Sequence, residues 1–320
     1  MRRLIAAAVL ACLAAAAYAQ DNYPSRPIRL VVGFAPGGAA DSVARAMSES
    51  FSKALGQPVV VENKPGAGSS IAAELVAKAA PDGYTLLIAS PASISVNPAL
   101  NPSLGYRPRD LLPVTQVTTS PLVLAVNADM AIRSLNELVA AAKRDPGKLN
   151  YSTSGNGSAP HLAMSLFTQL TGTQMMHVPY KGGAPAITSV MAGETQVTFG
   201  TSPTVLPQAK SGRLRVLAVS TRERSPLVPD HPGMREAGLA EYNLEFWYGI
   251  FAPAGTPPAV VKKIFDATAA AMQQPSVKAV LAREGTDVSL SASPEQFATF
   301  LVEDGKFWVD LVKTAGVKIE

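Results

Sequence analysis

Short runs of β-branched and aliphatic residues alternate with segments of helical periodicity, and this alternation constrains the fold more than any other feature. The runs are bounded by Gly, Pro or Ser and span residues 28–32, 59–61, 85–88, 122–126, 196–199 and 214–219. Between them, apolar residues recur at helical spacing, for example at Val43, Met47, Phe51 and Leu55. Continuous apolar runs suit strands that are buried on both faces. The alternation therefore predicts an α/β fold built from βα units around a mostly parallel sheet.

The chain of 320 residues is long enough for two compact units. No low-complexity linker separates such units, so ordered chain must cross any boundary. Two strand-like segments, 122–127 and 246–251, are the candidate crossings. We expect one lobe formed by residues 20–122 and 244–320, a second formed by residues 123–243, and a two-strand hinge. A ligand would then bind in the groove between the lobes.

The first 19 residues form a separate segment. A pair of arginines (2–3) precedes an apolar run (4–17) and an A-x-A cleavage site (17–19). The run is shorter than the roughly 20 apolar residues that a membrane span needs. The pattern predicts a cleavable signal peptide and export of the mature protein. Cys12 is the only cysteine, and residues 9–12 loosely resemble a lipoprotein cleavage box, which leaves lipidation as an alternative.

The remaining composition excludes several classes of function. Removal of the leader leaves 26 Lys and Arg against 24 Asp and Glu, so the mature chain is almost neutral. With 6% aromatic and 16% charged residues, it does not resemble a nucleic-acid binder. It has no cysteine, no HExxH motif, no G-x-S-x-G elbow and no P-loop. We expect no metal, no cofactor and no catalytic activity.

Two glycine loops carry the functional prediction. Each follows a strand and leads into a helix, with the sequences GFAPGGAAD (33–41) and SGNGS (154–158). A helix N-terminus has unpaired N–H groups and about half a positive charge, and glycine lets a ligand approach the backbone. Three or four N–H bonds to a carboxylate, with some apolar burial, reach the roughly 8 kcal/mol of micromolar binding. Such a site needs no Lys or Arg.

Each of these features also has a purely structural interpretation. A glycine-rich βα turn is commonly a tight connection, and a third turn, 66–70, is interpreted in that way because its strand bears charged residues. Asp41 is favoured as a partner of the helix dipole over a ligand contact. His161, in the first turn of its helix, is expected to face the groove, and Tyr180 is a candidate phenol there. Hydroxyls at strand ends, namely Ser90, Thr201 and Ser202, are candidate polar contacts.

Several motifs together resemble one family. They are PIRLVVGFAPGGAAD (27–41), VENKPGAG (61–68), PDGYT (81–85), GNGS followed by His161 (155–161), HVPYKG (177–182) and FAPAGTP (251–257). In this order they resemble the Bug family of tripartite tricarboxylate transporter substrate-binding proteins. The resemblance implies a type II periplasmic-binding-protein fold, two α/β lobes that close on a ligand carboxylate, and delivery to membrane permease subunits.

The resemblance also assigns residues. It carries the ligand contacts onto residues 34–41 and 154–158, held by main-chain groups, small hydroxyls and bridging waters. With the residues named above, the candidates are Phe34, Ala35, Gly37, Gly38, Ala39, Asp41, Ser90, Ser154, Gly155, Asn156, Gly157, Ser158, His161, Tyr180, Gly200, Thr201 and Ser202. Many relatives have an acidic residue after the equivalent of Phe199, where this chain has Gly200. The missing partner for an ammonium group favours a di- or tricarboxylate, a hydroxy acid or an aromatic carboxylate.

The leading hypothesis is a monomeric solute-binding protein that captures a small organic acid for uptake. A sensory module that reports ligand state to a membrane receptor is an alternative with the same sequence features. An exported hydrolase, with Ser154 or Ser158 as nucleophile and His161 as base, is a weaker one because no third residue orients the histidine. Recognition by main-chain groups leaves the identity of the acid open.

Overall fold

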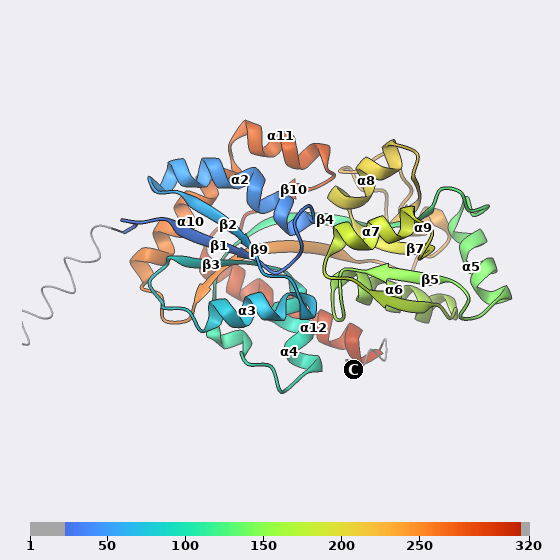
Figure 1. The fold of residues 1–320 in the computed structure, drawn as a ribbon, viewed down its shortest axis with the longest axis horizontal. Helices are drawn as coiled ribbons and strands as arrows, with labels where there is room; N and C mark the ends of the chain where they lie inside the picture. The colour runs from blue at the N-terminus through green and yellow to red at the C-terminus, as the bar shows by residue number, and fades with distance from the viewer. Residues whose placement is uncertain (1–22, 315–320) are drawn as a thin grey trace, which may run out of the picture.

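The computed structural model describes residues 23–314, which form a mixed ten-stranded sheet with helices on both faces (Figure 1). Hydrogen bonds order the strands β2-β1-β3-β9-β4-β7-β5-β6, and β8 and β10 also pair with β4. The strands are β1 (Ile28–Val32), β2 (Val59–Asn63), β3 (Thr85–Ala89), β4 (Leu111–Asn127), β5 (Asn150–Thr153), β6 (Met176–Pro179), β7 (Val197–Thr201), β8 (Leu214–Val219), β9 (Glu245–Pro253) and β10 (Asp287–Val288). The helices include α2 (Ala39–Leu55), α3 (Ser70–Ala77), α4 (Asn97–Leu100), α5 (Leu135–Arg144), α6 (Ala159–Thr171), α7 (Gly183–Met191), α8 (Ser202–Lys210), α9 (Met234–Ala237), α10 (Pro258–Met272), α11 (Pro275–Arg283) and α12 (Pro294–Thr314). The expected signal peptide and Cys12 lie outside the described residues and stay predictions.

We call the elements around β1, β2, β3 and β9 the first lobe. Its β2-β1-β3 core is parallel, with Leu30 opposite Val61 on one side and Leu86 on the other. Helix α2 buries the stripe that includes Val43 and Met47 against this lobe. The helical spacing in the sequence therefore reports the buried face correctly, because an amphipathic helix contributes to the core through one stripe.

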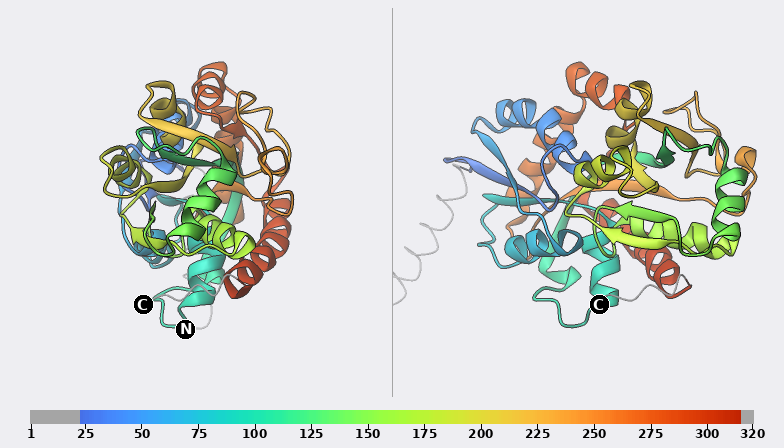
Figure 2. Two further views of the ribbon diagram at one scale, coloured as in Figure 1. Left: turned by 90° about the vertical axis from the view of Figure 1, so that its right-hand side faces the viewer. Right: turned by 45° about the vertical axis from the view of Figure 1, so that its right-hand side comes forward.

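The elements around β5, β6, β7 and β8 form the second lobe, which lies beside the first along the long axis of the molecule (Figure 2). Strand β5 pairs in parallel with both β6 and β7. Helices α6 and α7 follow β5 and β6, as expected for βα units. The fold class is thus the predicted α/β class.

The junction of the lobes departs from the predicted parallel sheet. Strand β9 is antiparallel to β3 and β4, and β4 is antiparallel to β7 and β8. Strand β4 carries the chain from the first lobe into the second, whereas β9 carries it back, so the two run in opposite directions. The prediction of a mostly parallel sheet is correct within each lobe and wrong where the chain crosses between them.

Strand β4 is also much longer than the apolar run at 122–126 indicates. It has 17 residues and begins at Leu111. Its first part contains Pro113 and several Thr and Gln residues, and its pairing with β9 shifts register twice. Such irregularities interrupt the hydrophobic pattern that marks a strand, so only the regular second part is visible in the sequence.

Ser220 holds the two crossing segments together and is fully buried. Its hydroxyl accepts a hydrogen bond from the Leu122 amide at 2.8 Å and donates to the Leu244 carbonyl at 2.5 Å. Its own amide donates to the Leu122 carbonyl, and its carbonyl accepts from the Leu244 amide. Leu122 is where β4 changes partners and Leu244 precedes β9. The expected lobe boundaries fall at these positions and stay a prediction.

Candidate functional site

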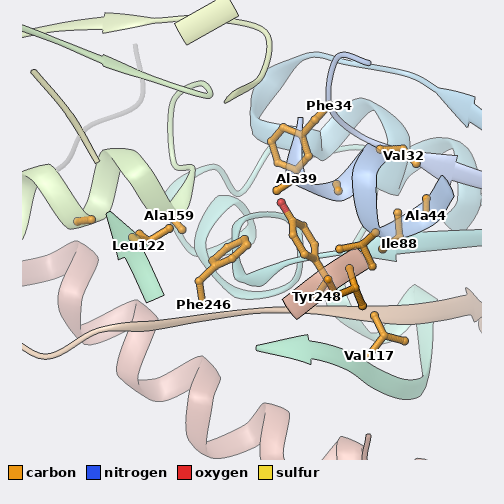
Figure 3. Packing of buried hydrophobic residues seen from close by; sticks show 14 of the residues in the cluster. Val32, Phe34, Ala39, Ala44, Ile88, Val117, Leu122, Ala159, Phe246 and Tyr248 are labelled. Carbon is orange, nitrogen blue, oxygen red and sulfur yellow. The ribbon is translucent and has the colours of Figure 1, made fainter. Parts of the chain in front are cut away.

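An enclosed cavity lies at the junction of the lobes, where the ends of β3 and β7 and the strand β9 meet the first turns of several helices. Figure 3 shows five of its lining residues, Phe34, Ala39, Ala159, Phe246 and Tyr248. Its free volume is about 20 Å³, close to the space that one water molecule requires. The lining residues are Phe34, Gly38, Ala39, Ser90, Ser154, Ser158, Ala159, Pro160, Gly183, Ala186, Ile187, Thr198, Phe199, Gly200, Thr201, Phe246 and Tyr248. None of these side chains carries a charge. We call this space the inner cavity.

Four helices begin at the inner cavity. Gly38 and Ser158 are the N-caps of α2 and α6, Thr201 is the N-cap of α8, and Gly183 is the first residue of α7. Each helix start presents unpaired N–H groups and about half a positive charge. Their convergence makes the cavity positive although its lining contains neither Lys nor Arg. The arrangement therefore favours an anion.

Two buried hydroxyls line the cavity without a hydrogen-bond partner. Ser90 follows β3 in the first lobe, Ser158 begins α6 in the second, and both side chains are buried. The Oγ atom of each makes no hydrogen bond with any residue in 23–314. A buried hydroxyl without a partner is costly. Both are therefore available to a polar ligand, one from each lobe.

The first glycine loop is anchored by an acidic side chain. The Gly37 amide donates to the Asp41 carboxylate at 3.0 Å, and the carboxylate also accepts from Arg45 Nε at 2.9 Å and Asn63 Nδ2 at 3.0 Å. Burial alone would raise the pKa of Asp41, but the hydrogen bonds from Arg45, Gly37 and Asn63 lower it. Asp41 thus shapes the loop from behind, and the Gly37 amide is not free for a ligand.

The second glycine loop is anchored by a histidine in the same relative position. The Gly157 amide donates to His161 Nδ1 at 3.1 Å. The His161 ring stacks on His177 with the ring centroids 3.9 Å apart, and His177 stacks on Tyr151 with the centroids 5.0 Å apart. Burial and the neighbouring His177 lower the pKa of His161 to about 3, and burial lowers that of His177 to about 4. His161 is therefore neutral and packed inside the second lobe. Contrary to the expectation that it faces the groove, it does not line the inner cavity.

A second pocket, which we call the outer pocket, lies next to the inner cavity and has a volume of about 190 Å³. The two share Phe34 and Ser154. Residues 66–69 of the third glycine turn line the outer pocket, so this turn borders the interlobe space. Nearby, the Ala35 amide donates to the Lys181 carbonyl at 3.1 Å, a direct main-chain contact between the lobes.

The structure gathers part of the predicted site. Eight candidates line the inner cavity: Phe34, Gly38, Ala39, Ser90, Ser154, Ser158, Gly200 and Thr201. Gly155, Asn156 and Tyr180 line the outer pocket. Ala35, Gly37, Asp41, Gly157, His161 and Ser202 line neither space. The Ser202 hydroxyl instead donates to the Pro121 carbonyl at 2.9 Å.

Sequence analysis missed the aromatic side of the cavity. Phe246 and Tyr248 project from β9 into the lining, and Phe199 and Ile187 add further apolar surface. Residues 246–251 attract attention in the sequence only as a possible crossing between lobes. The available signal was the spacing of Phe246 and Tyr248, because side chains two apart on a strand share one face.

Residues 43–317 match the family described as tripartite tricarboxylate transporter family receptor, TctC. The chain is 36% identical to protein BugT of Bordetella pertussis over 308 residues, which cover 96% of this chain and 94% of that protein. The chain belongs to this receptor family.

Solved structures of similar proteins agree with this family assignment. The chain resembles a periplasmic transporter at 40% identity and a TM-score of 0.89, over 93% of this chain and 100% of that one. It resembles an R. palustris protein with adipate at 33% identity, a TM-score of 0.89, and 92% and 99% coverage. MatC of Rhodopseudomonas palustris with bound malate matches at 33% identity, a TM-score of 0.86, and 91% and 100% coverage.

The family consists of solute receptors, and this chain has the fold of the periplasmic binding proteins within it. Among the described residues, no helix is long and apolar enough to cross a membrane. Within the same residues, no cluster of three or more His, Cys, Asp or Glu side chains could hold a metal ion.

Proposed function

We propose that this receptor captures a small organic carboxylate in the inner cavity. The observation that carries the proposal is the convergence of four helix N-termini on an enclosed, uncharged lining. A carboxylate there balances the positive ends of the helices, because no acidic side chain lines the cavity. It also accepts hydrogen bonds from first-turn amides that have no acceptor within their own helix. The unpartnered hydroxyls of Ser90 and Ser158 add one donor from each lobe.

Binding then requires the lobes to move. A volume of about 20 Å³ cannot admit an organic acid of several carbon atoms. The lobes must open for the acid to enter, and an acid that touches both lobes favours the closed arrangement. The Ala35 to Lys181 hydrogen bond and the close approach of Gly182 to Ala35 are contacts of the closed arrangement.

The lining narrows the class of acid. Gly200 lies in the cavity wall, and a Cβ atom added there would approach Val205 at 2.4 Å and Ile187 at 3.2 Å. Aliphatic side chains therefore fill the space beside Gly200, and no carboxylate in the lining could pair with an ammonium group. The proposed ligands are di- or tricarboxylates, hydroxy acids or aromatic carboxylates, but not amino acids. Relatives with adipate and with malate are consistent with this class.

Uptake is the proposed purpose of binding. The protein would be exported through its N-terminal leader, act in the periplasm as a monomer and deliver the acid to membrane permease subunits. A periplasmic sensor for a membrane receptor would use the same cavity. The hydrolase alternative loses support from the geometry, because the Ser158 hydroxyl has no base beside it and His161 Nδ1 is occupied by the Gly157 amide.

The test is a thermal-shift screen with organic acids that include adipate, malate, an aromatic carboxylate and an amino acid. A bound acid at 100 times its Kd stabilises the protein by about 2.7 kcal/mol. Ser158→Ala should reduce the shift, whereas Thr268→Val should not, because it removes an unpartnered buried hydroxyl from α10, outside the cavity. No shift with any acid, or a shift with the amino acid alone, would contradict the proposal.

A further inference from the structure

Tyr248 occupies an unusual position in the wall of the inner cavity. It lies on β9, opposite Thr118 of β4, so it belongs to a strand that crosses between the lobes. The residue is 6% exposed, and its ring and that of Phe246 form a T-shaped pair with their centroids 4.9 Å apart. Figure 3 shows its hydroxyl oxygen pointing toward Ala39 at the start of α2. The phenol thus joins the hinge strand to a helix N-terminus.

The hydroxyl oxygen already has a donor. The amide of Ala40, the second residue of α2, has no carbonyl to bond within its own helix, and its interaction with the Tyr248 oxygen lowers the pKa of the phenol against the larger effect of burial. Burial raises the pKa of the phenol, so the hydroxyl keeps its proton at any physiological pH. A phenol can accept one hydrogen bond and still donate one. The contact with Ala40 uses only the oxygen as an acceptor, so the hydroxyl proton of Tyr248 can still be donated to another group.

The hydroxyl of Tyr248 can donate its proton toward the inner cavity. The ring packs against Phe246, the oxygen faces the first turn of α2, and Tyr248 is one of the cavity-lining residues. Ser90 and Ser158, which line the same space, are themselves donors without partners. Three hydroxyls therefore surround a space in which an acceptor would satisfy all of them. A carboxylate, which only accepts hydrogen bonds when ionised, meets this requirement.

We infer that Tyr248 is a ligand-binding residue that donates its phenolic proton to the carboxylate of the captured acid. The inference rests on the proposed function and adds a contact from the hinge strand. The Ala40 amide at the positive N-terminus of α2 polarises the phenolic O–H bond. The polarised hydroxyl then donates a stronger hydrogen bond to the carboxylate, so the helix dipole of α2 stabilises the ligand through the phenol. An anion held in this way touches the first lobe, the second lobe and the strand between them.

The test compares wild type with Tyr248→Phe by calorimetric titration with each acid that stabilises wild type, starting with adipate and malate. The variant keeps the ring and its contact with Phe246 and loses only the hydroxyl. Affinity should fall about 10- to 100-fold, because a hydrogen bond to a charged acceptor is removed. Tyr242→Phe is the matched control, since it deletes a buried hydroxyl that donates to the Ala163 carbonyl at 2.9 Å, outside the lining. Its affinity should equal that of wild type.

The outcomes separate this inference from the proposed function. Equal affinities of wild type and Tyr248→Phe would overturn the role of Tyr248 and leave carboxylate capture intact. Equal losses in Tyr248→Phe and Tyr242→Phe would also overturn it, because the effect would then come from general loosening of the fold. A wild-type protein that binds no acid would overturn both. Melting temperatures measured without acid show that each variant is folded before it is titrated.

Discussion

The two glycine loops are anchored in the same way but by side chains of different chemistry. In each, a glycine amide donates to the side chain four residues later, in the first turn of the following helix: Gly37 to Asp41 and Gly157 to His161. Asp41 is an anion held by Arg45 and Asn63, whereas His161 is a neutral ring in an aromatic stack. The first loop is therefore fixed by charge-assisted bonds and the second by packing. Neither anchor adds a charged side chain to the cavity lining.

The largest effect is expected from removal of the charged anchor. Asp41→Ala leaves the Gly37 amide and the Asn63 amide without their buried acceptor, so the free energy of unfolding should fall by about 2–3 kcal/mol. Asp41→Asn keeps an acceptor and should lose less. Urea unfolding at pH 7.5 measures both. Equal losses in the two variants would show that the negative charge, and not the hydrogen-bond acceptor, anchors the loop.

Acid should distinguish the two loops. The depressed pKa of His161 favours the neutral ring in the folded state, so its contribution to stability is complete above about pH 6.5 and is lost as pH falls toward 3. At pH 5 the loss is about 2 kcal/mol. His161→Asn keeps an acceptor for Gly157 but does not titrate, and should lose less between pH 7.5 and pH 5. Asp41, whose pKa is lowered, stays ionised over this range. The same loss in variant and wild type would contradict the comparison.

Asp304 changes the pH dependence of stability in the opposite direction to the histidines, so its contribution has to be measured independently of theirs. Its carboxylate accepts from the indoles of Trp247 at 2.9 Å and Trp308 at 3.1 Å, but burial raises its pKa to about 6. A raised pKa contributes stability at low pH that is lost as pH rises through 6. Asp304→Asn removes the titrating group but offers one acceptor oxygen to two indoles that donate to different oxygens, so its diagnostic effect is a steeper loss of stability between pH 7.5 and pH 5. The same loss over this pH range in the variant and in wild type would show that Asp304 takes up no proton in the folded protein.

The first loop contacts the second lobe at Gly182, and in the closure that we propose this contact forms as the lobes come together. A Cβ atom there would lie 2.9 Å from the Ala35 nitrogen, so Gly182→Ala should oppose closure and weaken acid binding about tenfold, or about 1.4 kcal/mol. Gly193→Ala is the control, because Gly193 also has positive φ but no atom within 4 Å of the added carbon. Titration with a bound acid measures both. An equal effect of the two substitutions would exclude a specific role for the contact with Ala35.

The smallest effect on stability is expected at the two free hydroxyls. Ser158 makes no side-chain cap bond, and Ser90 has no partner, so each serine-to-alanine variant should change the free energy of unfolding by less than about 0.5 kcal/mol without acid. Both should weaken acid binding. Loss of affinity in only one variant would show that the acid depends on hydroxyls from a single lobe.

The sequence predicts the fold of each lobe well and the junction poorly. Helix α2 and strands β1 and β3 follow from periodicity alone because each has a regular buried face. The first part of β4 is irregular and half polar, so its pairing with β9 depends on partners more than 120 residues away. Periodicity is a local signal, and it cannot report such distant pairing.

The candidate site divides in the same way. Gly38, Ser154 and Ser158 are predicted because a helix start next to glycine is readable in sequence. The sequence predicts His161 on the groove, but its ring instead contacts the Gly157 amide and stacks on His177. Tyr248 was missed because its role depends on where β9 crosses the sheet, which local pattern does not define.

The contacts of Ser220 limit how the molecule can open. One side chain bridges both connecting segments, so neither segment can pivot without disturbing the other. In the opening that we propose, these shared hydrogen bonds couple the two segments, so we expect them to move together and not as two independent tethers.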